Sequence, residues 1–461
     1  MAALSTADLI RQYDRPGPRY TSYPTAVEFN ARFDEAAYRG RLQAAASDVD
    51  GPLSLYVHLP FCQERCTYCG CSIIATKRRD VARRYLDYVE RELELLADHL
   101  HGRRRVVQCH WGGGTPTYSS PAELERLHRA VTRHFDIDSG SECAVEIDPR
   151  VTTREQLQLL RSLGFTRLSM GVQDFSSDVQ DAIGRHQSRQ GTIDLYEFAR
   201  TLGFSSINLD LVYGLPRQRP ETFRTTLDTV VALRPDRIAT YSYAHVPWLR
   251  PHQRRIATAE LPDPSVKLEL VGNAIDTFTA AGYVPIGMDH FALPDDELAI
   301  AASAGVLHRN FMGYTTRRAA DVLGIGLSAI GDVRGAFAQN VKKLPAYYEA
   351  LDRGHFPIER GYSLSVDDLV RRHVITELMC NLHVDWRSVE IRFGLDVDSY
   401  FAPELAALAA PGGPVDDGLV TIGPGSLDVT ARGRLFVRTV CMHFDRYLPS
   451  HVGRPVFSRT I

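Results

Sequence analysis

Long apolar segments are missing from this 461-residue chain, because its most apolar stretches are interrupted by charge, as at Asp276. This absence excludes a helical membrane span. The first ten residues also lack the basic-then-apolar layout of a secretory signal. The formal net charge is only −3, so no overall attraction to nucleic acid or anionic lipid is expected. We therefore expect a cytoplasmic protein, and a monomer, with no membrane or nucleic-acid partner.

Cysteine is scarce, with eight residues in all, yet four of them fall within ten positions: Cys62, Cys66, Cys69 and Cys71. A disulfide knot fits poorly, because the chain is large and carries no secretory signal. A structural zinc site usually takes two separated pairs of ligands, and Cys69 and Cys71 are too close together to act as a pair. An iron–sulfur cluster is the third interpretation. A cubane cluster normally takes four thiolates, and three closely spaced ones would leave one iron open to a small molecule.

From residue 53 onward, short apolar runs alternate with amphipathic helical stretches such as 80–100. Capping boxes at Ser120 and Thr153 mark the starts of two further helices. This alternation predicts a parallel sheet with right-handed crossovers. Six or so units predict an α/β fold with an incomplete, TIM-like (β/α)6 barrel. The strand-like runs are 53–58, 106–111, 143–147, 167–172, 206–212 and 237–243, with a further candidate at 283–288.

The regions on either side of the barrel differ from it in pattern. We expect three parts: an N-terminal arm and helix at 1–50, the barrel at 51–350 and a C-terminal domain at 351–461. Prolines at positions 16, 18 and 24 exclude a continuous helix in the arm. The arm therefore either packs on the protein surface or lies across the mouth of the site. A helix is expected at 28–46.

The C-terminal region combines helices with a small hairpin around Gly423 and Gly425. This arrangement is typical of a winged-helix-like module. No Lys or Arg occurs between Pro411 and Ala431, whereas phosphate binding needs basic contacts. A structural or lid role is therefore favoured over nucleic-acid binding. The expected helices are 366–382, 385–393 and a closing helix at 431–447, and the hairpin strands are 418–422 and 427–430.

Chemistry in a parallel barrel collects at the carboxyl ends of the strands, and polar or glycine-rich segments stand at these ends here. Gly112 to Thr115 exposes backbone amides and allows a ligand to approach closely. Glu146 and Asp210 are suited to hydroxyl or ammonium groups. Gln173 and Arg185 are weaker candidates for the same site, because ordinary surface residues of these types are common.

Long motifs then identify a resemblance. Cys62, Cys66 and Cys69 have the C-x3-C-x2-C spacing of the radical S-adenosylmethionine (SAM) superfamily. Over nearly its whole length the chain resembles the oxygen-independent coproporphyrinogen III oxidases. The shared motifs are Arg-x-Gly-Pro-Arg-Tyr-Thr-Ser-Tyr-Pro-Thr from residue 15, His-Trp-Gly-Gly-Gly-Thr-Pro-Thr-Tyr from 110, Glu-x-Asp-Pro-Arg from 146, Leu-Ser-Met-Gly-Val-Gln-Asp-Phe from 168, Asp-Leu-x-Tyr-Gly-Leu-Pro from 210 and Gly-Met-Asp-His-Phe-Ala from 287.

The resemblance implies the cofactors and the residues that hold them. Cys62, Cys66 and Cys69 would bind a [4Fe–4S] cluster, and two SAM molecules are expected. Tyr56 and His58 are candidate catalytic residues, and Cys71 is expected to be a third one, on the substrate side. The positions that match contacts of the first SAM are Tyr56, Gly113, Glu146 and Ile330. Those that match contacts of the second are Tyr68, Gly114, Thr115, Gln173, Arg185, Asp210 and Ala244.

The resemblance also implies the reaction. A reductant of unknown identity would supply electrons to the cluster, and a 5′-deoxyadenosyl radical formed from SAM would attack coproporphyrinogen III. Two propionate side chains would lose CO2 and become vinyl groups, giving protoporphyrinogen IX. Arg19, Lys77 and Arg254 are candidates for binding the substrate carboxylates. Met312 stands where the family often has glutamine, which puts that position's role in doubt.

Two alternatives are kept. The related haem-chaperone branch resembles this chain from the cysteine strand onward, but it lacks the N-terminal arm and carries another residue at position 71. A nucleic-acid-binding zinc protein with a winged helix is the other alternative, and analysis of iron, sulfide and zinc separates it from the first two interpretations.

Overall fold

The computed structural model describes residues 6–451, 453–454 and 456–460; residues 1–5 of the expected arm lie outside them. Its centre is a run of six parallel strands in one twelve-stranded sheet, and each strand pairs with the next along the chain. This arrangement confirms the predicted incomplete α/β barrel. The six strands are β1 (Leu53–Leu59), β4 (Arg105–Gly113), β5 (Asp136–Ile147), β6 (Arg167–Gln173), β7 (Ser206–Tyr213) and β8 (Arg237–Ser242).

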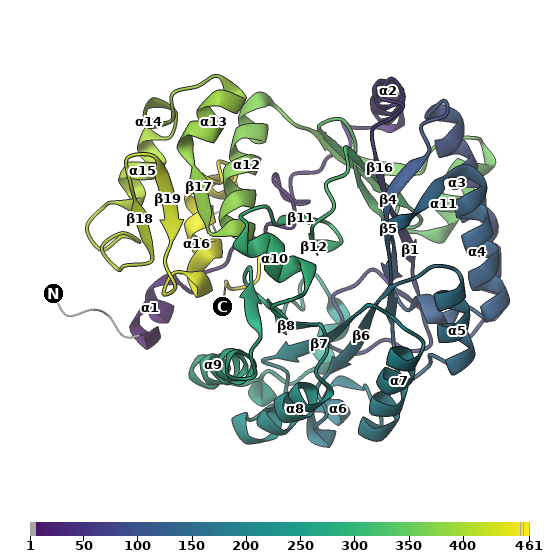
Figure 1. Ribbon diagram of the computed structural model, residues 1–461, viewed down its shortest axis with the longest axis horizontal. Helices are drawn as coiled ribbons and strands as arrows, with labels where there is room; N and C mark the ends of the chain where they lie inside the picture. The colour runs from purple at the N-terminus through teal and green to yellow at the C-terminus, as the bar shows by residue number, and fades with distance from the viewer. Residues whose placement is uncertain (1–5, 452, 455, 461) are drawn as a thin grey trace.

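Helices cover the outer side of these strands, as the right and lower edges of Figure 1 show. Both predicted capping boxes form, at Ser120 and Thr153. Among the described residues no helix combines the length and apolar character needed to cross a bilayer. The outer helices are α3 (Arg79–His99), α4 (Pro121–His134), α5 (Arg154–Ser162), α6 (Ser177–Ile183), α7 (Arg189–Thr201), α8 (Pro220–Leu233) and α9 (Pro264–Ala280).

The sheet extends beyond both ends of the parallel run. On one side β13 (Asp321–Ile325) lies parallel to β1, and β14 (Ile330–Asp332), β15 (Ala336–Asn340) and β16 (Ile358–Ser363) continue antiparallel. On the other side β10 (His290–Ala292) and β9 (Val284–Ile286) are antiparallel. The candidate strand at 283–288 therefore forms as β9, but it is an edge strand and not a further strand–helix unit.

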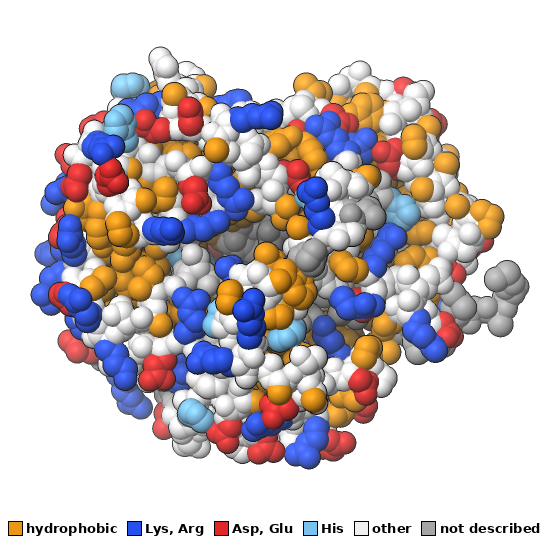
Figure 2. Space-filling view, turned by 180° about the vertical axis from the view of Figure 1, so that it is seen from behind, with side chains coloured by type: hydrophobic (Ala, Val, Ile, Leu, Met, Phe, Trp, Pro, Cys, Tyr) orange, Lys and Arg blue, Asp and Glu red, His pale blue; other side chains and the backbone are white. Residues whose placement is uncertain are grey.

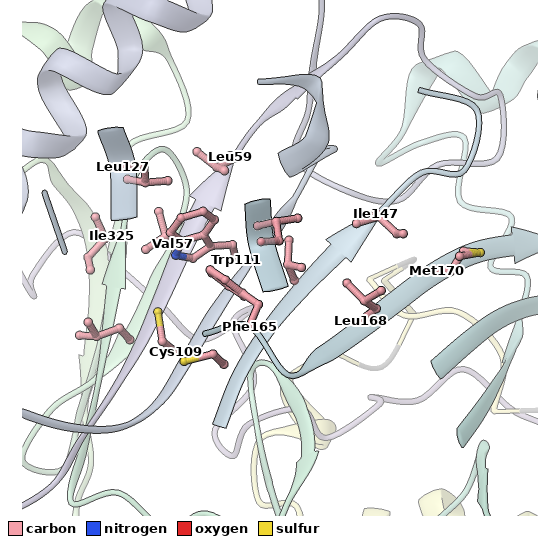
Figure 3. Packing of buried hydrophobic residues seen from close by; sticks show 14 of the residues in the cluster. Val57, Leu59, Cys109, Trp111, Leu127, Ile147, Phe165, Leu168, Met170 and Ile325 are labelled. Atoms are coloured by element: carbon pink, nitrogen blue, oxygen red, sulfur yellow. The ribbon is translucent and has the colours of Figure 1, made fainter. Parts of the chain in front are cut away.

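The main core lies between the parallel strands and the outer helices (Figure 3). Trp111 on β4 is fully buried, and its ring packs edge-on against Phe165 with centroids 4.6 Å apart. Val57 and Ile325, on neighbouring strands, are also fully buried. Burying each such side chain contributes roughly 1.5–3 kcal/mol, so the strands are held firmly where they approach the site.

A second hydrophobic cluster belongs to the C-terminal residues, which form a separate lobe at the left of Figure 1. The hairpin strands pair with an additional strand that the sequence did not reveal. The lobe consists of α12 (Val366–Asn381), β17 (His383–Asp385), α13 (Trp386–Phe393), α14 (Val397–Tyr400), α15 (Ala402–Leu408), β18 (Val420–Ile422), β19 (Ser426–Val429) and α16 (Val437–Cys441).

Two predicted helices are shorter than expected. The helix expected at 28–46 is α2 (Glu35–Ala46), because Asp34 caps it by accepting a hydrogen bond from Ala37 N–H. The closing helix at 431–447 is broken into short turns around α16. Phe436 leaves helical geometry (φ −106°, ψ 8°), and its ring packs edge-on against that of Tyr13.

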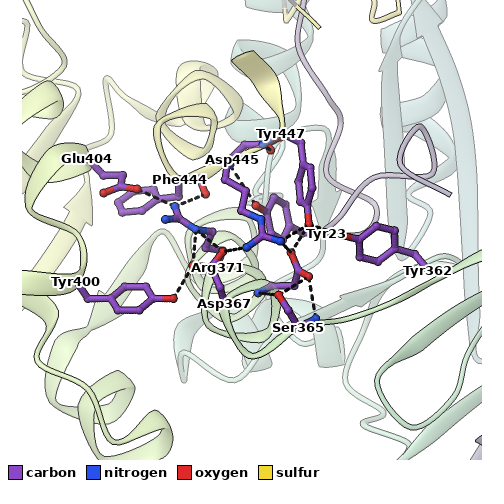
Figure 4. Close-up of polar contacts among 12 residues, drawn as sticks. Tyr23, Tyr362, Ser365, Asp367, Arg371, Tyr400, Glu404, Phe444, Asp445 and Tyr447 are labelled. Carbon is purple, nitrogen blue, oxygen red and sulfur yellow. Dashed lines mark hydrogen bonds and ion pairs between the residues drawn. The ribbon is translucent and has the colours of Figure 1, made fainter. Parts of the chain in front are cut away.

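The N-terminal segment packs mainly on the C-terminal lobe. It begins with α1 (Thr6–Tyr13), and Tyr20 and Tyr23 further along belong to the lobe's core. Tyr23 Oη accepts a hydrogen bond from Arg446 N–H beside a polar cluster that includes Arg371 and Tyr447 (Figure 4). The arm therefore joins the lobe rather than simply covering the barrel.

Arg438, which is almost fully buried, ties the arm to the chain's end. Its guanidinium donates to the carbonyls of Gly17 (2.6 Å), Pro18 (2.9 Å), Arg459 (3.3 Å) and Thr460 (2.8 Å). No carboxylate within 4 Å pairs with it among the described residues. Neutral backbone acceptors from two distant segments thus satisfy one buried cation.

Replacing Arg438 should loosen this junction. Arg438→Met leaves four carbonyls without their donor, three of them buried, and we expect a loss of about 2–4 kcal/mol in the free energy of unfolding. Urea unfolding measures the loss, and limited proteolysis reports whether the arm detaches. Arg387→Met, at an exposed position of α13, is the matched control. Equal stability of the two variants would contradict the assigned role.

Candidate active site

The cysteine loop begins directly after β1 and is held at both ends. Short parallel strands β2 (Phe61–Cys62) and β3 (Ile74–Ala75) pair across its base. Ile74 N–H donates to Pro60 O at 2.7 Å, and Thr76 N–H donates to Cys62 O at 2.9 Å. The two ends of the loop are thus bonded to each other directly after β1. This closure fixes where the thiols lie.

The three thiols of the C-x3-C-x2-C motif lie among hydroxyl and guanidinium groups. Cys62 Sγ is 3.4 Å from Thr115 Oγ1. Cys66 Sγ is 3.8 Å from Arg150 Nη2 and 3.9 Å from Arg185 Nη1. These donors would stabilise negative charge on a thiolate–cluster unit. Among the described residues no three His, Cys, Asp or Glu side chains converge to hold a single metal ion.

Contact between Cys69 and Cys71 separates the pKa values of the two thiols. The contact lowers the pKa of Cys69 to about 6 and raises the pKa of Cys71 well above its usual value, although Cys71 is exposed. Cys71 therefore keeps its proton while Cys69 is ready to act as a thiolate ligand. This asymmetry fits a three-cysteine site with a fourth thiol beside it.

The glycines at the end of β4 lie so close to neighbouring groups that a residue with a side chain would not fit there. Gly113 has φ +110°, and a Cβ there would lie 2.4 Å from the His58 ring. A Cβ on Gly112 would lie 2.6 Å from the Glu146 carboxylate, and one on Gly114 would lie 2.6 Å from Pro60 C. The three strand ends β1, β4 and β5 can therefore converge only because this segment lacks side chains.

Glu146, at the end of β5, accepts hydrogen bonds from Gly113 N–H (3.0 Å) and from His110 Nε2 (3.1 Å). Burial alone would raise its pKa, but these bonds hold the pKa of Glu146 below its usual range. The carboxyl therefore stays ionised at neutral pH. His110, which the sequence reasoning did not assign, is what orients this carboxylate.

Tyr56 and His58 lie next to each other on β1. Tyr56 Oη is 3.0 Å from His58 Nδ1, and His58 Nε2 is 2.9 Å from Ser72 O. These partners assign the Nε2–H tautomer, and burial lowers the pKa of His58, so the ring is neutral. Because both nitrogens are engaged, the ring is well placed to hold the cysteine loop. A direct catalytic role for either side chain stays a prediction.

Asp210 faces Glu146 across a polar cavity of about 140 Å³ inside the barrel. Its carboxylate accepts from Ser169 Oγ (2.9 Å) and Asn208 Nδ2 (2.7 Å). Burial, with the nearby charge of Glu146, raises the pKa of Asp210 to about 6. Met312 also lines this cavity, so the position where the family often has glutamine does face the site.

Gln173 ends β6, and Arg185 follows α6 and reaches back to the same strand. Arg185 donates to Asp148 Oδ2 (3.0 Å), just after β5, and to Gly171 O (2.6 Å), so it links the end of β5 to β6. Gln173 has φ +69°, an unusual conformation for a side-chain-bearing residue. A Cβ on Gly171 would lie 2.8 Å from Gln173 Nε2. The side chains of Gln173 and Arg185 therefore both lie beside Gly171.

Tyr68 and Ala244 meet through Gln253, a residue that the sequence reasoning missed. Gln253 Nε2 donates to Tyr68 O (3.0 Å) and Ala244 O (3.2 Å). Asp148 and Arg150 were missed as well, although both lie in the Glu-x-Asp-Pro-Arg motif. Their signal was present in the sequence, whereas Gln253 lies in a short 3₁₀ helix that the sequence reasoning did not predict.

Ile330 lies apart from the Asp210 cavity, on β14 beside β13. A Cβ on Gly324 would lie 2.5 Å from Ile330 C, and Gly324 pairs in register with Tyr56. The preceding loop is anchored by the buried Glu92 carboxylate, which accepts from Gly326 N–H at 2.7 Å, and by Tyr85 Oη, which accepts from Leu327 N–H at 2.8 Å. Ile330 is thereby positioned near Tyr56.

The three candidate carboxylate-binding residues occupy different environments. Arg19 donates to Ser242 O at 2.6 Å, in a small cavity that β8 shares with α9 and Arg438 rather than with Asp210. This position does not support substrate binding by Arg19. Lys77 is 80% exposed and lies 3.7 Å from Glu64, and Arg254 is exposed. Nothing in their surroundings assigns either to the substrate.

Comparisons with known proteins agree with this geometry. Residues 56–230 match the family model of the radical SAM superfamily, and residues 364–436 match the model of the HemN C-terminal domain. The oxygen-independent coproporphyrinogen III oxidase of Salmonella typhimurium is 46% identical over 98% of both chains. That of Pseudomonas aeruginosa is 46% identical over 99% of this chain and 98% of its own.

A solved structure agrees as well. Coproporphyrinogen III oxidase from Escherichia coli, described as a radical SAM enzyme, superimposes with a TM-score of 0.90 at 44% identity, covering 97% of this chain and all of the other. The barrel and its cysteine loop are thus those of the radical SAM class. Within that class, the chain belongs to the family of oxygen-independent coproporphyrinogen III oxidases.

Gly113 offers a direct test of the crowded strand ends. Gly113→Ala places a methyl group against the His58 ring at positive φ, so the loop must shift, and we expect SAM affinity to fall at least tenfold. Equilibrium dialysis of SAM, together with iron content, measures this effect. Gly140→Ala has no atom within 4 Å of its new methyl group and is the matched control. Wild-type affinity in Gly113→Ala would show that the close approach is not needed.

Proposed function

We propose that this protein decarboxylates two propionate side chains of coproporphyrinogen III to vinyl groups without oxygen, giving protoporphyrinogen IX. One observation carries the proposal: the cysteine loop meets Gly112–Gly114 and Glu146 at the carboxyl ends of the barrel strands. The names of the curated relatives supply the substrate.

The donor set fits the cofactors that the family uses. Cys62, Cys66 and Cys69 would hold the [4Fe–4S] cluster. When bound, the cluster and SAM would supply the radical chemistry that the oxidative decarboxylation of a propionate requires. The first SAM would lie against Tyr56, Gly113, Glu146 and Ile330. The second would lie against Tyr68, Gly114, Thr115, Gln173, Arg185, Asp210 and Ala244.

The chain's own residues bind and orient these groups. The ionised Glu146 carboxylate suits the ammonium group of an amino acid. The exposed amides expected in the glycine segment are not free, because the N–H groups of Gly113, Gly114 and Thr115 already donate to Glu146, Leu59 O and Phe61 O, so this segment contributes close approach instead. Arg150 and Arg185 place positive charge beside Cys66, which suits a negatively charged cluster there. The Glu146 side chain is 41% exposed, so the bound cofactors and substrate, and not the strand ends alone, would have to exclude water from the site.

The haem-chaperone alternative is less well supported. This chain has the N-terminal arm, which packs into the C-terminal lobe, and it has Cys71 next to Cys69. Both features distinguish the oxidases from the chaperone branch.

We further propose that the protein acts as a cytoplasmic monomer with an arm, barrel and C-terminal domain divided near residues 50 and 350, and that a separate reductant supplies electrons.

Cys71 is proposed as a hydrogen donor or positioning group on the substrate side. In Cys71→Ser we expect wild-type iron and sulfide content and SAM cleavage, but vinyl product reduced at least a hundredfold, because serine does not donate a hydrogen atom readily. Liquid chromatography of porphyrins and 5′-deoxyadenosine measures both. Cys143→Ser, at a buried thiol on β5, is a cysteine control. If Cys71→Ser lost its cluster, the residue would be a ligand instead.

The raised pKa of Asp210 predicts that SAM binding depends on pH. Its pKa is raised to about 6 in the free protein, and a cationic ligand favours the ionised carboxylate. SAM affinity should therefore fall as the pH drops through about 6, approaching tenfold per pH unit below it. Equilibrium binding between pH 8 and 5.5 measures this dependence. Asp210→Asn should bind more weakly and lose the pH dependence, whereas an unchanged profile would exclude Asp210 from the site.

A further inference from the structure

A basic surface patch lies beside the cysteine loop, and the reaction proposed above does not use it. We call Arg65, Arg250, Arg254 and Arg255 the arginine patch. Arg254 and Arg255 are exposed, and Arg65 and Arg250 are partly exposed. Among the described residues none of the four has a carboxylate within 4 Å, whereas ion pairs are common elsewhere on this surface. Their positive charge is therefore not neutralised locally.

Apolar side chains adjoin the arginine patch. Trp248 is 46% exposed and Leu249 is 53% exposed, directly before Arg250 in the sequence. Exposed tryptophan next to arginine is the composition typical of the energetic centre of protein–protein interfaces. The net charge of the whole chain is −3, so this patch is a local feature and not part of a generally basic protein. Basic side chains also gather around the hollow on the face seen in Figure 2.

The 3₁₀ helix that carries the patch is bonded to the cysteine loop. This helix is η2 (Pro251–Arg255). His252 Nε2 is 2.7 Å from Cys69 O, and Gln253 Nε2 donates to Tyr68 O at 3.0 Å. Arg255 Nη2 lies 3.5 Å from Arg65 O, next to Cys66. Hydrogen bonds thus connect η2 to the backbone at or next to two of the three expected cluster ligands.

We propose that the arginine patch, with Trp248 and Leu249, is the docking surface for an acidic one-electron carrier protein that reduces the cluster. This inference rests on the proposed function, which requires an electron at the cluster. The transfer moves one electron from carrier to cluster and neither forms nor breaks a bond. The His252–Cys69 hydrogen bond provides a short route from the docking surface to a cluster ligand.

Substrate carboxylates are the competing anions, but the structure favours the carrier. None of the four arginines lines the cavity between Glu146 and Asp210. The exposed Trp248 and Leu249 suit a macromolecular partner that covers them. Complementary charge would also accelerate encounter, by a factor of ten to a thousand at low salt.

Arg254→Glu tests the proposal, because no hydrogen bond or ion pair ties this side chain to the described residues and the fold should be unaffected. The probe is reduced flavodoxin, an acidic one-electron carrier, and stopped-flow absorbance follows cluster reduction. We expect the second-order rate constant to fall about tenfold at low ionic strength and to approach that of the wild type in 0.5 M salt, since salt screens the interaction. Trp248→Ser should weaken flavodoxin binding without this salt dependence.

Controls separate docking from other effects. Arg133→Glu makes the same charge change at an exposed position on α4 and should leave the rate unchanged. Dithionite, a small reductant, should reduce all variants equally. Binding of flavodoxin to cluster-free protein, measured by calorimetry, should weaken in Arg254→Glu and provides a readout that does not require turnover.

Two results would overturn the proposal. One is wild-type flavodoxin binding and reduction kinetics in both Arg254→Glu and Trp248→Ser. The other is a raised KM for coproporphyrinogen III in Arg254→Glu with unchanged flavodoxin kinetics, which would assign the patch to the substrate. A failure of the proposed function looks different: the cluster would accept electrons from dithionite, yet coproporphyrinogen III would not be converted.

Discussion

The close approach of β1, β4 and β5 at their carboxyl ends is the constraint on which the site depends. His58 and Leu59 lie in register with Gly112 and Gly113, and Gly114 N–H donates to Leu59 O at 2.9 Å. A side chain at any of these glycines would meet an imidazole, a carboxylate or the backbone within 3 Å. The cysteine loop, the glycine segment and Glu146 therefore come together through one packing condition. The packing of the strand ends determines where the binding groups lie, so a mutation that relieves the crowding also displaces those groups.

Around this centre, buried polar anchors fix segments that are distant in sequence. Glu92 is fully enclosed, and besides Gly326 it accepts from Tyr347 Oη and Asn340 Nδ2, each at 2.6 Å. Burial raises its pKa to about 7, so its hydrogen bonds offset a substantial cost of enclosing a carboxyl group. Arg438 has the corresponding role for the arm and the lobe. Such anchors hold Ile330 and the outer segments in place without contributing to the chemistry themselves.

The barrel could be predicted from the sequence because its signals are local. Each parallel strand appears as an apolar run, and the capping boxes at Ser120 and Thr153 mark helix starts within four residues. The antiparallel strands β14 to β16 were not found in this way, although each pairs with its neighbour along the chain, because β14 has only three residues and no helix separates it from β13 or β15. At Phe436, where the expected closing helix breaks, the ring packs against Tyr13, more than four hundred residues away. The candidate ligands were predictable from motif spacing and resemblance, whereas Gln253 and His110 act through hydrogen bonds that only the fold creates.

The most direct test of this account is an anaerobic turnover measurement with iron–sulfur-reconstituted protein, a low-potential reductant, SAM and coproporphyrinogen III. We predict protoporphyrinogen IX with two CO2 released per molecule, together with 5′-deoxyadenosine, and loss of all three products in Cys62→Ser. Formation of 5′-deoxyadenosine without any vinyl product would contradict the assigned substrate. Stoichiometric zinc without sulfide in the purified protein would contradict the cluster itself.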